Sequence, residues 1–244
     1  MSKFFVAILA LLILSLAIYS PNIVRLYKLA NLYNEKSIAK NFISIDQIFE
    51  TSSPIPASEK PYIFEKKEYA LPESYVFEGD ELNLLDGLDH FHTDGLIILH
   101  DGKMLFENYW NGNTKDSKHI AFSVSKSYLS ALFGIAVDEG LIDSIDDKVS
   151  KYLDDFDGTG YEDVKIKNLL QMSSGIEFNE DYADPNSDIN RFARATARGS
   201  SFRDFAKTLK NGKEQGTYNH YVSIDTQVLG MILESVTDMP LREY

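Results

Sequence analysis

Residues 122–140 read FSVSKSYLSALFGIAVDEG, and the rest of the chain is best understood around this stretch. Its apolar side chains leave almost no polar face, which predicts a helix from about Phe122 to Gly140 that is buried all round. Gly140 is a typical residue to follow the end of a helix. Ser123 and Lys126 then stand one helical turn apart, at the amino end of a central helix.

Ser123 and Lys126 have the spacing of a nucleophile and its base. A serine hydroxyl is a weak nucleophile at neutral pH and needs a base within hydrogen-bonding distance. Tyr221 would complete a Ser/Lys/Tyr proton relay, and the first helical turn would stabilise an oxyanion through its amide groups and dipole. The same spacing at Ser37 and Lys40 lies in a polar stretch and is interpreted as chance. The plain alternative for Ser123 is a helix-capping serine beside a solvated lysine.

The elements around this helix follow from local patterns. Two β-rich runs, 95–100 and 103–110, flank Asp101-Gly102, and an Asp-Gly pair between such runs predicts a hairpin. The stretch 164–172 reads as a short strand or turn that leads into a helix, 188–210 as helical, and 226–236 as another buried helix.

The amino-terminal part has a different character. Residues 4–24 are almost wholly apolar and fit a membrane anchor better than a signal peptide, because no Ala-x-Ala cleavage pattern ends the run. We predict an anchor or signal segment at 1–24, a tether at 25–74 and a globular domain at 75–244, with the domain outside the cytoplasm, either periplasmic or at the cell surface.

Composition excludes several classes of function. Lys and Arg number 24 against 37 Asp and Glu, and a net charge of −13 argues against a nucleic-acid partner. The absence of cysteine excludes thiolate chemistry. His90 and His92 lack a third ligand nearby, so we expect no metal. The acidic stretch 138–163 and the arginine face of Arg191, Arg194 and Arg198 are interpreted as solvated surface; the arginines could instead receive an acidic substrate end.

Five stretches occur in an order typical of one family. They are the hairpin at 95–110, the serine motif at 122–126, the segment 140–153, the segment VKIKNLLQMSSG at 164–175, and the pairs Gly216-Thr217 and Leu229-Gly230. From about Thr93 to Leu241 the chain thereby resembles the serine beta-lactamase and penicillin-binding family, in its class C and family VIII esterase branch. The resemblance implies an α/β fold of the beta-lactamase/transpeptidase type, with an incomplete antiparallel sheet flanked by helices and a helical lobe that carries Tyr221.

The resemblance also assigns the site. It implies catalytic roles for Ser123, Lys126 and Tyr221, with a neutral, desolvated Lys126 taking the serine proton and Tyr221 relaying it to the leaving group. Tyr221 is preferred to Tyr218 because it alone has the family's spacing from both flanking pairs. The residue two places later, usually asparagine in the beta-lactamases, is Ser223, a candidate for substrate binding.

The expected substrate is a small ester or linear amide, cleaved without a cofactor. The run 221–227 looks most like the 6-aminohexanoate-dimer hydrolase branch, so an esterase or amidase is expected. The alternatives are a catalytically inactive ligand-binding module, a D-alanyl-D-alanine peptidase and a beta-lactamase. The family's third motif is missing, since His100-Asp101-Gly102 matches only in letters, and we expect a chain truncated at its carboxyl end.

Overall fold

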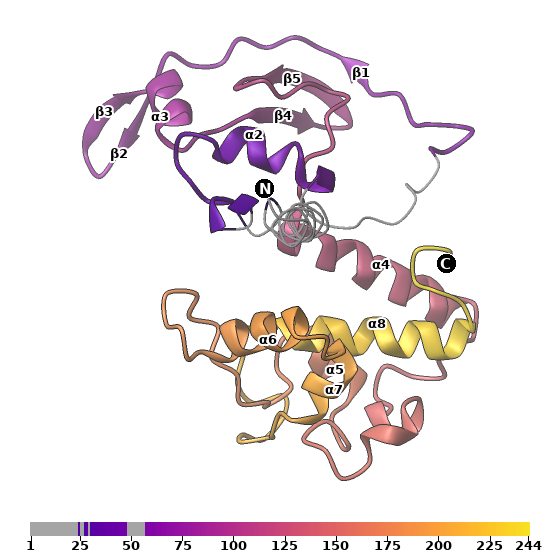
Figure 1. Cartoon of the computed structure of the whole chain (residues 1–244). Coiled ribbons are helices and arrows are strands. Elements are labelled where there is room, and N and C mark those ends of the chain that lie inside the picture. The colour runs from indigo at the N-terminus through magenta and orange to yellow at the C-terminus, as the bar shows by residue number, and fades with distance from the viewer. Residues whose placement is uncertain (1–23, 25–26, 29, 48–56) are drawn as a thin grey trace, which may run out of the picture. The chain divides into compact units, whose positions relative to one another are not determined.

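The computed structural model describes residues 24, 27–28, 30–47 and 57–244 and divides into two compact units, residues 1–120 and 121–244 (Figure 1). Each unit has its own elements. The predicted anchor at 4–24 lies, apart from Val24, outside the described residues. Among the residues described, no helix combines the length and apolar character needed to cross a membrane. The domain boundaries inferred from the sequence stay predictions.

The first unit contains the predicted hairpin. β4 (Gly95–His100) and β5 (Lys103–Tyr109) pair antiparallel. Asp101 and Gly102 connect them with φ angles of 49° and 73°, the left-handed conformation that a two-residue hairpin turn requires. The hairpin prediction is therefore confirmed.

The described part of this unit also contains further short elements. β1 (Glu65–Lys66), within the range predicted as a tether, pairs parallel with β5, so the sheet has the order β1-β5-β4 and is mixed rather than wholly antiparallel. β2 (Ser74–Phe77) and β3 (Asp80–Asn83) form a second, antiparallel sheet. Its helical elements include α2 (Ile38–Phe42), the 3-10 helix η1 (Ile45–Gln47) and α3 (Leu84–His90).

The second unit is mainly helical. It begins with the 3-10 turn η2 (Phe122–Val124) and α4 (Ser125–Asp138), where one longer helix was predicted. Gly140 follows α4 with φ of 74°, and the Leu141 amide donates to the Ala136 carbonyl at 2.9 Å. The helix therefore ends next to Gly140, as predicted from the sequence. The remaining elements are η3 (Val149–Lys151), η4 (Asp154–Phe156), α5 (Ile166–Leu170), α6 (Asp188–Ala197), α7 (Phe202–Lys207) and α8 (Ser223–Thr237).

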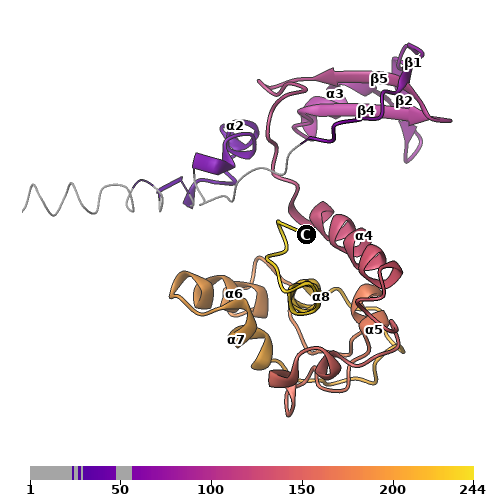
Figure 2. The same cartoon turned by 90° about the vertical axis from the view of Figure 1, so that its right-hand side faces the viewer.

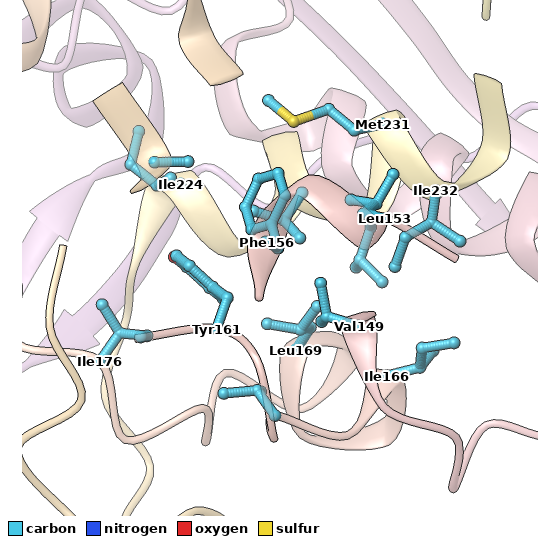
Figure 3. Close-up of a cluster of buried hydrophobic side chains, with 14 of the residues drawn as sticks. Val149, Leu153, Phe156, Tyr161, Ile166, Leu169, Ile176, Ile224, Met231 and Ile232 are labelled. Atoms are coloured by element: carbon cyan, nitrogen blue, oxygen red, sulfur yellow. The ribbon is translucent and has the colours of Figure 1, made fainter. Parts of the chain in front are cut away.

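The core of this unit lies around α8 rather than α4. Figure 2 looks along α8 and shows α4, α5, α6 and α7 arranged about it. Buried side chains come from most turns of α8 and from the segment between η3 and α5, where Val149, Phe156 and Leu169 meet Ile224 and Ile232 (Figure 3). α4 buries only Leu129, Phe133 and Ala136, so the prediction of a helix buried on every side was wrong for α4 and describes α8 instead.

The predicted helix at 188–210 is interrupted. Gly199, with φ of 93°, follows the end of α6, and the Ser201 hydroxyl accepts a hydrogen bond from the Asp204 amide to start α7. A glycine after one helix and a capping serine before the next are local signals for two helices, so tertiary packing was not needed to find this break.

Candidate active site

Ser123 lies in the turn that leads into α4. Lys126 is in the first turn of the helix, and its Nζ donates to Ser123 Oγ at 3.0 Å. The amino end of α4 is the positive end of the helix dipole, which favours negative charge on an adjacent oxygen. The predicted spacing of serine and lysine therefore produces direct contact.

The backbone before Ser123 is strained. Phe122 has φ of 43°, a left-handed conformation that a bulky side chain rarely adopts. The Ser125 hydroxyl donates to the Phe122 carbonyl at 2.6 Å and holds this turn. Backbone strain of this kind is concentrated at functional sites, where the surrounding structure enforces it. No local pattern around Phe122 predicts this strain.

Tyr221, which lies just before α8, contacts the same oxygen. Its hydroxyl donates to Ser123 Oγ at 2.8 Å, and Lys126 Nζ lies 5.3 Å from the centre of its ring. Burial alone would raise the pKa of the Tyr221 phenol, but hydrogen bonds with Ser123 and Lys126 and the Lys126 charge outweigh it and hold that pKa below 10. The three residues predicted as a group are thus brought together.

Ser223, predicted to bind substrate, makes hydrogen bonds to another residue of the chain, Glu180. Ser223 is the first residue of α8, and its hydroxyl donates to Glu180 Oε1 at 2.5 Å while its amide donates to Glu180 Oε2 at 3.2 Å. The Tyr182 hydroxyl also donates to Glu180 Oε1, at 2.9 Å. Burial and the Glu180 carboxylate raise the pKa of Tyr182 to about 12, which keeps it a donor.

Sequence reasoning missed Glu180. The contact joins positions that are 43 residues apart, and no local pattern links them. The available clue is indirect, because a carboxylate is a good acceptor for the first amide of a helix whose capping position, here Val222, has no side-chain acceptor of its own.

The other candidates do not join this group. Tyr218 stacks on His220, with Lys213 Nζ 3.7 Å from its ring centre. On α6, Arg191 pairs with Asp188 and Arg194 donates to the Pro185 carbonyl at 2.5 Å. Within the described part of the chain, no three potential metal ligands lie close together.

The geometry suits attack by Ser123 Oγ on an electrophilic carbon. Two neighbouring groups contact the hydroxyl, each able to receive its proton once deprotonated, and the helix terminus beside it favours a developing oxyanion. Such an arrangement supports acyl transfer through an ester on the serine.

Comparison with known proteins agrees with this chemistry. A family described as "Beta-lactamase" matches residues 83–244. A 6-aminohexanoate-dimer hydrolase of Paenarthrobacter ureafaciens is 31% identical over 186 residues, covering 71% of this chain and 47% of that protein. A putative D-alanyl-D-alanine carboxypeptidase of Escherichia coli K12 is 24% identical, covering 81% of this chain and 50% of that protein. The chain thus spans about half the length of these curated relatives.

A solved structure has the same fold. The putative 6-aminohexanoate-dimer hydrolase from Bacillus anthracis matches with a TM-score of 0.77 at 17% identity, covering 87% of this chain and 58% of that one. At this level of identity the match establishes the fold and says nothing of substrate.

Proposed function

The chain belongs to the beta-lactamase family, and on that premise we propose that it is a serine hydrolase which cleaves ester or linear amide bonds through an acyl-Ser123 intermediate. The observation that supports this most directly is the convergence of Lys126 Nζ and the Tyr221 hydroxyl on Ser123 Oγ, at 3.0 and 2.8 Å. If Ser123 were only a helix-capping serine beside a solvated lysine, no contact with Lys126 and no contact with a tyrosine from another element would be required.

In the proposed reaction, Ser123 Oγ attacks the substrate carbonyl carbon. The serine proton passes to the Lys126–Tyr221 pair, whose members both contact that oxygen. Tyr221 then protonates the leaving amine or alcohol as the carbon–heteroatom bond breaks. Water attacks the acyl-serine ester, gives its proton to the same pair and regenerates Ser123.

The substrate class rests on the relatives. The protein from Paenarthrobacter is named as a hydrolase of a 6-aminohexanoate dimer, and we carry its preference for a small linear amide over to this chain as part of the proposal. The D-alanyl-D-alanine carboxypeptidase relatives favour a second candidate, a peptide ending in D-alanyl-D-alanine. Parallel assays with p-nitrophenyl esters, linear amide dimers and such peptides separate the two.

The hydrolase proposal is tested by active-site labelling of the full chain. A fluorophosphonate probe should label the wild type and leave the Ser123→Ala variant unlabelled. Equal labelling of both, or none of a folded wild type, would reject the proposal and favour the inactive ligand-binding module.

We also propose that residues 4–24 anchor the chain in a membrane, with the domain on the extracytoplasmic side. The support is the length and apolar character of that run. Membranes from expressing cells should retain the full-length chain after an alkaline carbonate wash, and release of the intact chain would contradict the anchor.

A further inference from the structure

The residues on either side of Tyr221 are held by one short segment, Phe178 to Glu180. On the amino side, His220 Nε2 donates to the Phe178 carbonyl at 2.7 Å. On the carboxyl side, the Ser223 amide and hydroxyl both donate to the Glu180 carboxylate. The same segment therefore holds the side chain of the residue before Tyr221 and, through Ser223, the backbone after it.

This segment is itself anchored to the rest of the unit. Phe178 is buried in the core. The Asn179 amide donates to Asp188 Oδ2 at 2.9 Å, and the Asn179 carbonyl accepts from the Ile189 amide at 3.1 Å, so both backbone groups of Asn179 are tied to the start of α6. Because its own position is fixed, this segment can hold the residues that it contacts, His220 and Ser223, in place.

Glu180 also supplies what the start of α8 lacks. Val222 occupies the capping position of α8 but makes no side-chain hydrogen bond to the helix, and the first amide, that of Ser223, is satisfied by Glu180 instead. A carboxylate beside a helix amino end is favoured by the helix dipole as well. The contact thereby sets where the helix begins, two residues after Tyr221.

We propose that Glu180 is a positioning residue which, through Ser223 at the start of α8, holds the Tyr221 hydroxyl against Ser123. This inference rests on the proposed hydrolase function, because it assigns Glu180 an effect on the reactivity of Ser123. A positioning role and a purely stabilising role for Glu180 predict different effects on the pKa of Tyr221. Tyr221 has a lowered pKa because of its contacts with Ser123 and Lys126, so a displaced Tyr221 should regain a higher pKa.

The test is the rate at which the fluorophosphonate probe reacts with the full chain between pH 6 and 10. In this reaction Ser123 Oγ bonds phosphorus, the phosphorus–fluorine bond breaks with loss of fluoride, and the serine proton passes to the Lys126–Tyr221 pair. Glu180→Ala should react about tenfold or more slowly, since small displacements of a catalytic group cost large factors in rate. Its pH–rate midpoint should also move upward. Glu180→Gln should recover most of the rate and the wild-type midpoint, because the amide oxygen can still accept from Ser223.

Glu177→Gln is the matched control, since it removes an exposed carboxylate from the same loop. It should behave as the wild type. Melting temperatures of all variants identify any that fail to fold, in which case Glu180→Gln and Ser223→Ala carry the comparison. Ser223→Ala should then slow the reaction and raise the midpoint, while Glu180→Gln retains wild-type behaviour.

The outcomes separate the two proposals. A folded wild type that does not react overturns both. A reactive wild type with a Glu180→Ala variant of unchanged midpoint overturns the positioning role alone, whatever the change in rate or melting temperature. If Glu180→Ala does not fold, an unchanged midpoint in Ser223→Ala has the same meaning.

Discussion

The Tyr221 hydroxyl donates to Ser123 Oγ across a sequence separation of 98 residues. Ser123 lies just before α4 and Tyr221 just before α8, so the contact joins the amino ends of two helices that pack against each other. The positions of both side chains are therefore set by helix packing rather than by a flexible loop, which is what a proton relay requires.

Replacement of Tyr221 by phenylalanine tests the relay. Tyr221→Phe keeps the ring and removes the hydroxyl that contacts Ser123 Oγ. The probe reaction should slow by about 10²- to 10⁴-fold, the range typical of a lost general acid–base group, with little change in melting temperature. Tyr218→Phe, which alters a hydroxyl on the neighbouring exposed tyrosine, should keep the wild-type rate. A Tyr221→Phe variant that reacts at the wild-type rate would exclude the relay.

The pH dependence of the same reaction follows from the lowered pKa of Tyr221. The deprotonated phenolate is the form that accepts the serine proton, so the rate should rise with pH and level off above a midpoint below 10. The midpoint is measured from rates at constant ionic strength. In Tyr221→Phe this rise should be lost, and its persistence there would assign the titration to another group.

The parts of the site that depend on local patterns were predictable. Lys126 lies one helical turn from Ser123 in any helix, and the turn at Asp101-Gly102 needs only the conformations these two residues favour. The choice of Tyr221 over Tyr218 came from spacing to flanking motifs, and the structure places Tyr221 at the serine.

The parts that depend on packing between distant segments were not predictable. The contact of Glu180 with Ser223 spans 43 residues, and nothing near either residue specifies the other. The apolar patterns of α4 and α8 are similar in the sequence, yet the neighbouring elements enclose α8 and leave one side of α4 uncovered within this unit. Burial of a uniformly apolar helix is decided by its neighbours, which composition does not reveal.

Gly175 should be intolerant of any side chain. Its φ is 78°, and a Cβ there would lie 2.1 Å from the Lys213 carbonyl oxygen. The backbone of Lys213 is held in place because the amides of Gly212 and Lys213 both donate to the Gly175 carbonyl. Gly175→Ala should lower the free energy of unfolding by about 2 kcal/mol or more, from backbone strain plus the clash. Gly158→Ala is the control, since it has φ of 75° but open space around it, and should cost only about 1 kcal/mol. Equal losses in urea denaturation would contradict the role of the clash.

Asp225 is a carboxyl group buried in the core, in the first turn of α8. Its Oδ1 accepts from the Tyr161 hydroxyl at 2.9 Å, and no described residue donates to its Oδ2. Burial raises the pKa of Asp225 to about 7 against an ordinary value of 3.8, although the neighbouring hydroxyls of Ser174 and Tyr161 oppose the rise. The native state therefore keeps this proton at a pH where the unfolded chain has released it.

Stability should consequently fall as pH rises from about 4 to about 7, because over that range the native state binds more protons than the unfolded state. The full effect is at most roughly 4 kcal/mol. Asp225→Asn mimics the neutral form, so it should lose this slope and be more stable than the wild type at pH 8 while resembling it near pH 4. Asp238→Asn, an exposed change just after the same helix, should keep the wild-type slope. Urea denaturation followed by circular dichroism at each pH measures the free energies, and an undiminished slope in Asp225→Asn would show that other groups cause it.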